Sequence, residues 1–252
     1  MSDLTTDDER HNRAFWDRDA DAYQAAHGEA LTDAPRAWGV WRIGDDDVHA
    51  LGDVRGLDVL ELGCGAAQWS VALARDGARV VGLDISLAQL SHARGTVPLV
   101  LASAEAVPLR GASFDVVFCD HGAMSFCPPE RTVAEAARLL RPGGRLVFCK
   151  TTALVYLTWD AKRERQTRTL HNPYFGMRTF VFDEGTVDHQ IPYGEWIRLF
   201  RCHGLVVEDL IELRPSERAT TTYDDFIPRS WARAWPAEEI WVVAKPASDA
   251  RT

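Results

Sequence analysis

The sequence predicts an α/β fold in which helices flank a mostly parallel sheet. Three observations support this prediction. From residue 58 onward, apolar runs of about five residues alternate with amphipathic stretches of about ten. A turn with two glycines, "GCG" at 63–65, follows the first run, and Asp84 ends the second. Because the carboxyl ends of parallel strands share one edge of a sheet, we expect both features to lie there together.

The elements follow in order along the chain. Residues 11–51 mix helix formers with aromatic side chains, and Asp45 to Asp47 suit the start of a helix, so this region is expected to be helical. The expected strands are 58–62, 79–83, 98–103, 114–119, 145–149, 205–213 and 239–245, and the expected helices between them are 68–77, 87–95, 131–140 and 193–204.

We expect one domain over residues 1–252, because no repeat or low-complexity linker divides the chain. The segment 151–193 loses the alternation of strands and helices and is rich in aromatic residues, so it reads as an insertion. The expected parts are a helical N-terminal cap (11–51), a cofactor-binding core (58–150), a lid insertion (151–193) and the end of the sheet (194–245).

Composition excludes several classes of function. With 28 basic and 37 acidic residues the net charge is −9, which opposes binding to nucleic acid. The five cysteines show no CxxC or CxxH spacing, and no His, Asp or Glu spacing indicates a metal. The N-terminus is polar and no apolar run is long enough to span a membrane. We therefore expect a cytoplasmic monomer or homodimer with no nucleic-acid, membrane or metal partner.

The glycine turn indicates the class of ligand. Gly63 and Gly65 let backbone N–H groups approach a ligand closely, and Asp84 can accept hydrogen bonds from ribose hydroxyls. A dinucleotide site requires a third glycine where Gln68 stands. Glu61 would also repel a diphosphate, whereas it favours the ammonium group of a methionine. The ligand expected here is S-adenosylmethionine.

Five motifs in order carry a family resemblance: "ELGCG", "GLDIS", "ASAEAVPL", "FDVVFCDHG" and "LLRPGGRLVF". The chain resembles a class I S-adenosylmethionine-dependent methyltransferase, of the small-molecule branch similar to ubiquinone/menaquinone-biosynthesis methyltransferases. The resemblance covers roughly residues 58–150. It implies a Rossmann-like, seven-stranded sheet that is parallel except for one late strand.

The resemblance also implies which residues contact the cofactor. Where the third motif of the family has an Asp for the adenine amino group, this chain has Ser103, followed by Ala104 and Glu105, so we expect a changed adenine contact. Cys64 has no adjacent base and is interpreted as a structural member of the loop. The implied contacts are Glu61, Gly63, Cys64 and Gly65 at the methionine end, Asp84 at the ribose, Ile85, Ser103, Ala104 and Glu105 at the adenine, Cys119 through its carbonyl, and Tyr23 closing over the site.

The residues expected to act on the acceptor lie near the fourth motif and in the two caps. His121 follows the fourth strand and suits a general base, and Asp120 orients it or caps the next helix. Aromatic residues of the insertion form a lid for a planar acceptor, or else pack as the insertion's own core. The candidate acceptor contacts are Trp38, Trp41, His171, Tyr174, Phe175 and Tyr193.

The function expected from the sequence is methyl transfer from S-adenosylmethionine to a small aromatic or apolar metabolite, which leaves S-adenosylhomocysteine. Two alternatives remain open at this point. One is a cyclase or isomerase that binds S-adenosylmethionine without transferring a methyl group, and the other is a non-catalytic binding module. A dinucleotide-dependent reductase is disfavoured because the third glycine is missing.

Overall fold

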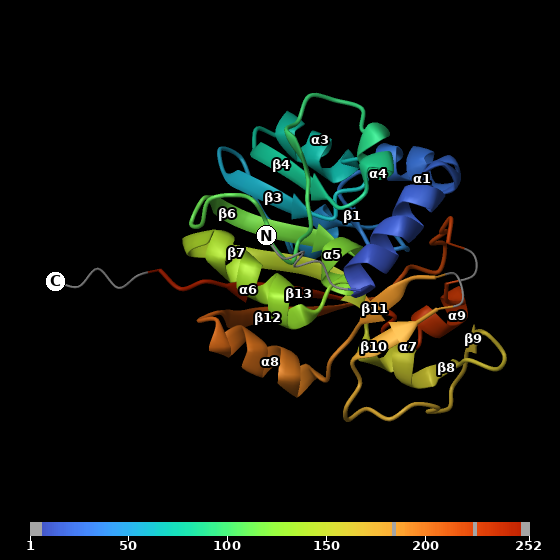
Figure 1. Cartoon of the computed structure of the whole chain (residues 1–252). Helices are drawn as coiled ribbons and strands as arrows, with labels where there is room; N and C mark the ends of the chain where they lie inside the picture. Colours follow the sequence, from blue (N-terminus) through green and yellow to red (C-terminus); the bar gives the residue numbers. More distant parts are fainter. Residues whose placement is uncertain (1–6, 183–184, 224–225, 248–252) are drawn as a thin grey trace.

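A seven-stranded sheet forms the centre of the molecule (Figure 1). The structure is a computed structural model and describes residues 7–182, 185–223 and 226–247. In spatial order the strands are β12 (Val206–Leu213), β13 (Glu238–Ala244), β7 (Leu140–Thr151), β6 (Phe114–Asp120), β3 (Asp58–Leu62), β4 (Arg79–Asp84) and β5 (Leu99–Leu101). β13 runs antiparallel to both of its neighbours and the other pairings are parallel, so the predicted sheet is confirmed.

Helices cover both faces of the sheet, as the continuous apolar strands require. One face packs under α5 (Gly122–Phe126), α6 (Pro129–Leu139) and α8 (Tyr193–Cys202), with Phe148 and Trp241 in its core. The other face packs under α3 (Gln68–Arg75), where Trp69 meets Trp38 and Phe118. The short helix α4 (Leu87–Ser91) follows β4. The central strands of the sheet are therefore buried on both sides, whereas the outer strands β12 and β5 are largely exposed.

The N-terminal cap is only partly helical, which corrects the expectation for residues 11–51. The helix α1 (Asp7–Asp33) ends before Pro35, and a small hairpin follows, made of β1 (Ala37–Trp38) and β2 (Ile43–Gly44). Gly39, at φ +68°, turns the chain between these strands. The expected helix start at Asp45 is confirmed by α2 (Asp45–Val48).

The insertion builds a small substructure at the carboxyl edge of the sheet. It holds α7 (Ala153–Thr158), β8 (Trp159–Asp160), β9 (Arg165–Gln166), β10 (Thr179–Val181) and β11 (Val187–His189), and α9 (Arg229–Ala232) follows later in the chain. Asn12 of α1 exchanges hydrogen bonds of 2.8 and 2.9 Å with the backbone of Val187. The hairpin β10–β11 thus lies beside α1 and α5, at the right-hand side of the view (Figure 1).

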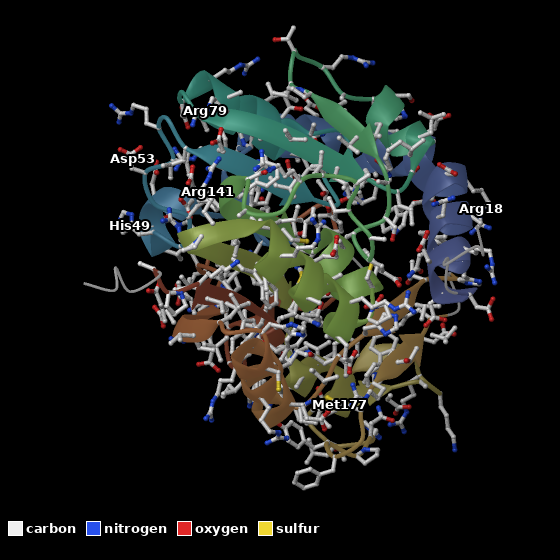
Figure 2. All side chains as sticks on the ribbon, turned by 60° about the vertical axis from the view of Figure 1, so that its left-hand side comes forward. Arg18, His49, Asp53, Arg79, Arg141 and Met177 are labelled. Carbon is white, nitrogen blue, oxygen red and sulfur yellow. The ribbon has the colours of Figure 1, made fainter. Side chains whose placement is uncertain are left out.

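At the opposite, amino edge of the sheet, ion pairs link residues at the starts of neighbouring strands. Arg141 bridges Asp58 and Asp115 at 2.8 and 2.9 Å, and Arg79 reaches Asp58 at 2.6 Å. Figure 2 shows Arg79 and Arg141 together at this end of the molecule, with Arg18 at the opposite end on α1. These acids are neutralised by arginines.

In the part of the chain that is described, no helix has the length and apolar character needed to cross a membrane.

Candidate functional site

The turn after β3 lies against the turn after β6, at the point where the strand order of the sheet reverses. Gly63 adopts φ +73°, and a Cβ there would lie 2.6 Å from the backbone nitrogen of Ala123. A Cβ on Gly122 would lie 2.7 Å from the carbonyl oxygen of Gly63. Only glycines permit this approach, and ligands of open α/β sheets bind at such a reversal.

Asp84 is fixed at the mouth of this turn. Its Oδ2 accepts a 2.8 Å hydrogen bond from the N–H of Gly65, and its Oδ1 accepts one of 2.8 Å from the N–H of Ser86. Burial raises the pKa of Asp84, while these N–H groups lower it. Each carboxylate oxygen keeps a further lone pair, so the side chain fits a ribose diol. Ile85 follows, half-buried.

Glu61 is engaged within the protein. Its Oε2 accepts hydrogen bonds from the backbone N–H of Ser70 at 3.0 Å and from the Ser70 hydroxyl at 2.5 Å. Burial raises the pKa of Glu61 to about 8, so the carboxyl is largely protonated at neutral pH. The structure thus places Glu61 as an anchor between β3 and the first turn of α3.

The two cysteines among the expected contacts are buried thiols. A Cβ on Gly82 would lie 2.9 Å from the Cys64 sulfur, so this side chain packs against β4. The Sγ of Cys119 accepts a 3.4 Å contact from the N–H of Met124 at the start of α5. Burial raises the pKa of both thiols. They are therefore unreactive packing residues, as interpreted for Cys64 from the sequence.

The third motif folds into a tight turn after β5. The Oγ of Ser103 accepts a 3.2 Å hydrogen bond from the N–H of Glu105. Ala104 is buried, and the buried carboxylate of Glu105 pairs with Arg131 of α6 at 3.0 Å. The Ser103 hydroxyl thus holds the turn together, and Glu105 links the turn to α6.

α1 lies over the glycine turn through a chain of amides and a tyrosine. Gln24 donates to Gln89 of α4 at 2.9 Å and accepts from Gln68 of α3 at 3.2 Å. At the preceding residue of α1, the Tyr23 hydroxyl lies 2.6 Å from that of Tyr223. Burial raises the pKa of Tyr23 to about 12. Gln68, which replaces the third glycine of a dinucleotide site, thus helps to close the cap.

His121 is held in a strained conformation beside a buried acid. Its backbone adopts φ +59° and ψ −33°, which is unusual for a residue with a Cβ. Its Nε2–H donates to Oε1 of Glu238 at 2.5 Å. Burial lowers the pKa of His121, but the hydrogen bond and the charges of Glu238 and Asp120 outweigh burial and raise it. With Nε2–H bound to Glu238, Nδ1 is the ring atom that can take a proton.

Backbone N–H groups of the N-terminal hairpin bind both neighbouring acids. Gly39 donates to the two oxygens of Asp120 at 3.0 and 3.3 Å, and Val40 donates to Oε1 of Glu238 at 2.8 Å. A Cβ on Gly39 would lie 2.4 Å from that same oxygen. The hairpin therefore positions Glu238 for His121, and a glycine is required where it turns.

The expected acceptor contacts do not come together. Trp38 is fully buried, with its Nε1 donating to Asp45 at 2.9 Å. Tyr193 donates to Glu239 at 2.6 Å on the opposite face of the sheet, and the Tyr174 hydroxyl accepts from the N–H of Tyr193 at 2.9 Å. Phe175 is 85% exposed. These four residues pack or face solvent, and we leave them out of the site proposed below.

His171 and Trp41 complete the set. His171 is exposed and bonds to the Thr167 hydroxyl at 2.8 Å. Trp41 is buried in an aromatic cluster with residues of segment 219–235, where Tyr223 and Phe226 also pack. Phe226 presents its ring to that of His121 at 6.4 Å. Of the candidate acceptor contacts, Trp41 is thus the one that shares a hydrophobic cluster with Phe226, the ring that meets His121.

Sequence reasoning missed Glu238, Tyr223, Phe226 and the hairpin at Gly39. The available signal was "AEEIW", where two acids open an otherwise apolar strand. A charged pair at the start of a buried strand requires a partner or a function. The partner of Glu238, His121, is 117 positions away in the sequence. Local sequence patterns therefore could not predict that the two residues pair.

Asp120, His121 and Cys149 offer ligand atoms within 4.8 Å of one another. Asp120 and Cys149 are paired residues on β6 and β7. Both oxygens of Asp120 already accept from Gly39, and burial raises the pKa of the Cys149 thiol well above its ordinary value. A protonated thiol is a poor metal ligand, so we assign no metal to this group.

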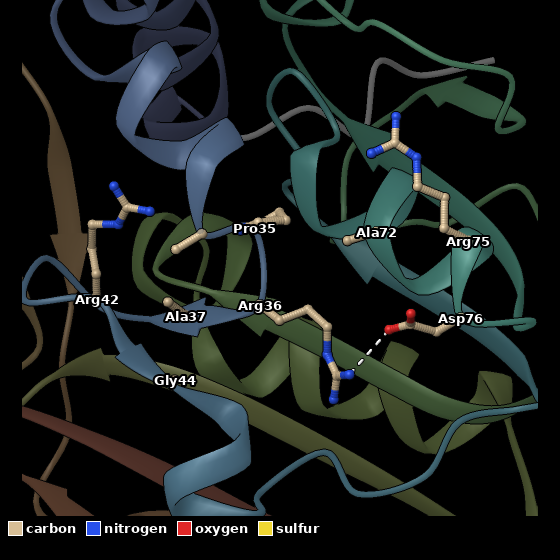
Figure 3. Close-up of a pocket in the computed structure, with 9 residues that line it drawn as sticks. Pro35, Arg36, Ala37, Arg42, Gly44, Ala72, Arg75 and Asp76 are labelled. Atoms are coloured by element: carbon tan, nitrogen blue, oxygen red, sulfur yellow. Dashed lines mark hydrogen bonds and ion pairs between the residues drawn. The ribbon is translucent and has the colours of Figure 1, made fainter.

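A separate cleft of about 390 Å³ opens between the N-terminal hairpin and the end of α3 (Figure 3). Arg36 crosses it to pair with Asp76 at 3.0 Å, and Arg42 and Arg75 border it. The cleft is lined by none of the residues around Asp84 and His121.

Comparison with known proteins gives a consistent result. Residues 60–148 match the family model described as "Methyltransferase domain". Over 117 residues, 44% of this chain and 47% of the relative, the chain is 34% identical to a demethylmenaquinone methyltransferase of Clavibacter sepedonicus. A demethylmenaquinone methyltransferase of a Mycobacterium species is 40% identical over 102 residues, 40% of this chain and 44% of the relative. The chain thus spans less than half the length of these curated relatives.

Solved structures extend the likeness in fold beyond the matched domain. An S-adenosylmethionine-dependent methyltransferase from Mesorhizobium loti superposes with a TM-score of 0.66 at 21% identity, over 79% of this chain and 95% of that one. A Burkholderia thailandensis 1,6-didemethyltoxoflavin-N1-methyltransferase, crystallised with its substrate and S-adenosylhomocysteine, superposes with a TM-score of 0.57 at 16% identity over 98% and 93%. The resemblance expected from the motifs is confirmed: residues 60–148 match the methyltransferase-domain model, and the chain has the fold of solved S-adenosylmethionine-dependent methyltransferases.

Proposed function

We propose that this protein transfers a methyl group from S-adenosylmethionine to a small aromatic or apolar metabolite. The observation that carries the proposal is the placement of Asp84 and the His121–Glu238 pair at the carboxyl edge of one sheet, on either side of the turn at Gly63. The superposed toxoflavin methyltransferase carries S-adenosylhomocysteine, and the matched curated relatives are named for methyl transfer to a menaquinone precursor.

The residues present fit this cofactor. Asp84 would hold the ribose hydroxyls, the backbone at Gly63 and Gly65 would line the methionine end, and Tyr23 would close the site from α1. S-adenosylmethionine supplies an electrophilic methyl group when bound. Ser70 bonds Oε2 of Glu61, which would hold α3 in place, and the other oxygen of Glu61 would be left for the methionine end of the cofactor.

The chemistry left to the protein is orientation and proton removal. His121, held through Nε2 by Glu238, would accept the acceptor's proton at Nδ1 while the acceptor attacks the methyl group. Holding the acceptor in line contributes up to about 7–11 kcal/mol in favourable cases. The segment 151–193 is proposed to act as a lid, with support from its hairpin against α1 and α5.

The alternatives from the sequence are less well supported. A cyclase or isomerase would share the cofactor, but the matched relatives and the superposed structures are named for methyl transfer. All five cysteines are free, which suits the reducing conditions of the cytoplasm, the compartment we propose.

Calorimetric titration of the purified protein with S-adenosylhomocysteine tests the proposal, with NAD as the control. We expect micromolar binding of S-adenosylhomocysteine and no binding of NAD. An absence of heat from both ligands, after removal of any co-purified ligand, would contradict the enzyme assignment.

A further inference from the structure

The acids at the carboxyl edge are less completely paired than those elsewhere on the sheet. Glu238 is 1% exposed, and its Oε2 has no hydrogen-bond partner among the residues that the structure describes. On β11, Asp188 accepts from the Tyr156 hydroxyl at 2.9 Å through Oδ2. Its buried Oδ1 likewise lacks a partner within the described ranges. A buried carboxylate oxygen left unbonded is costly, so both oxygens indicate a missing donor.

The charges around His121 show what kind of donor is missing. Three carboxylates act on its ring: Glu238 from β13, Asp120 from β6 and Asp188 from β11. Burial raises the pKa of Asp188 to about 6, so this acid remains mostly ionised at neutral pH. Even when His121 is protonated, three carboxylates surround its single positive charge. At the amino edge, in contrast, arginines pair with Asp58 and Asp115.

Lys150 offsets only part of this charge, because its ammonium group acts on Asp188 and on Glu239 together. It is fully buried, and its Nζ donates to the carbonyl of His189 at 2.8 Å while lying over the Trp196 ring at 4.7 Å. Burial lowers the pKa of Lys150 to about 8. A sulfonium group has no N–H or O–H hydrogen to give, so the proposed cofactor does not satisfy Glu238 through its reacting centre either.

Aromatic rings complete the surroundings. Phe226 lies edge-on to His121, and the Tyr223 ring stacks on His27 at 4.0 Å. Both belong to the cluster that contains Trp41, whose neighbour Val40 donates to Glu238. Carboxylates combined with aromatic faces are the chemistry that recognises organic cations.

We infer that the methyl acceptor is an aromatic or apolar amine, whose protonated nitrogen is bound by Oε2 of Glu238 and whose apolar part packs against the cluster that contains Phe226 and Trp41. This inference rests on the proposed function and adds a chemical class of acceptor to it. Molecules that bring a carboxylate or phosphate to this place are excluded by the three acids, and a neutral hydroxyl would satisfy a lone pair but leave the charge uncompensated.

The test uses three probes with one ring and different polar groups: benzylamine, benzyl alcohol and benzoate. Each is titrated calorimetrically into the protein saturated with S-adenosylhomocysteine. We expect benzylamine to bind at least about tenfold more tightly than benzyl alcohol, and benzoate not to bind. Equal or tighter binding of the alcohol or of benzoate, or no binding of benzylamine, overturns the inference.

Variants locate the amine. Glu238→Gln keeps an acceptor for His121 and Val40 but removes the charge, and we expect benzylamine affinity to fall at least about tenfold. Glu208→Gln, on the exposed part of β12, is the matched control and should leave it unchanged. Asp188→Asn is a second variant, in which we expect the affinity for benzylamine to fall by less than in Glu238→Gln. An unchanged affinity in Glu238→Gln overturns the inference.

Titration with S-adenosylhomocysteine distinguishes failure of the proposed function from failure of the inferred acceptor class. If S-adenosylhomocysteine itself does not bind, the proposed function fails and the inference fails with it. If S-adenosylhomocysteine binds and benzylamine does not, the inference alone fails and the methyltransferase assignment stands.

Discussion

Glu238 and Glu239 are neighbours on β13, are both almost fully buried, and point to opposite faces of the sheet. Glu239 accepts hydrogen bonds from Tyr193 at 2.6 Å and from Trp241 at 3.1 Å, opposite Lys150 on β7. Glu238 faces His121 with one oxygen bonded and the other without a partner in the described part of the chain.

The difference in hydrogen bonding between these two acids distinguishes a structural role from a binding role. Where each polar atom of a buried charge finds a partner inside the protein, the charge contributes to specifying the fold. Where one atom does not, the protein carries a cost that a ligand can relieve. We therefore assign the Glu239 face to stability and the Glu238 face to binding and catalysis, and variants on the two faces should respond differently.

The largest effect is expected for His121→Ala. Loss of a general base lowers the rate of methyl transfer by about 10²–10⁴-fold. Affinity for S-adenosylhomocysteine should change little, because Asp84 and the glycine turn remain. Turnover measured as S-adenosylhomocysteine release in the presence of the acceptor, beside calorimetric binding, distinguishes the two. Equal losses of both would make His121 a binding residue.

Lys150→Met tests the other face. Removing the buried ammonium group lowers the free energy of unfolding by about 1–3 kcal/mol, since the carbonyl of His189 loses its donor and Glu239, whose pKa burial raises to about 7, loses its opposite charge. Denaturant unfolding gives the value. The double variant Lys150→Met with Glu239→Gln should lose less stability than the single variant. If Glu238→Gln destabilises the protein as much as Lys150→Met does, the distinction between the faces is wrong.

Asp84→Ala should weaken S-adenosylhomocysteine binding at least about tenfold, because hydrogen bonds to a charged acceptor are lost. Asp209→Ala, at an exposed position of β12, is the matched control. The comparison uses dissociation constants from calorimetry. An unchanged constant for Asp84→Ala would remove this residue from the site.

The smallest effect concerns pH. A base must be neutral to act, so the rate should rise with pH through the pKa of His121, which its acidic neighbours raise above the ordinary 6.5. Glu238→Gln removes the largest of these raising contributions and should move the midpoint of the rate profile to lower pH. A midpoint that stays in place, or moves upward, would show that Glu238 does not set the basicity of His121.

Sequence patterns predicted the core well, because β3 to β7 and their helices are encoded by local periodicity and by turn residues such as Gly63 and Gly65. The same reasoning failed where contacts are long-range. Trp38 was expected at the acceptor, but its nitrogen meets Asp45 and its ring fills the space above Phe118. Phe226 contacts His121 only because of tertiary packing. The sequence therefore did not predict that Phe226 belongs to the site.

The most direct measurement is a crystal structure of the protein grown with S-adenosylhomocysteine. The account predicts this molecule over the Gly63–Gly65 turn, with its ribose hydroxyls within hydrogen-bonding distance of Asp84 and its sulfur on the side of His121. Binding elsewhere, for example in the cleft between Arg36 and Arg75, would contradict the assignment of the carboxyl edge as the active site.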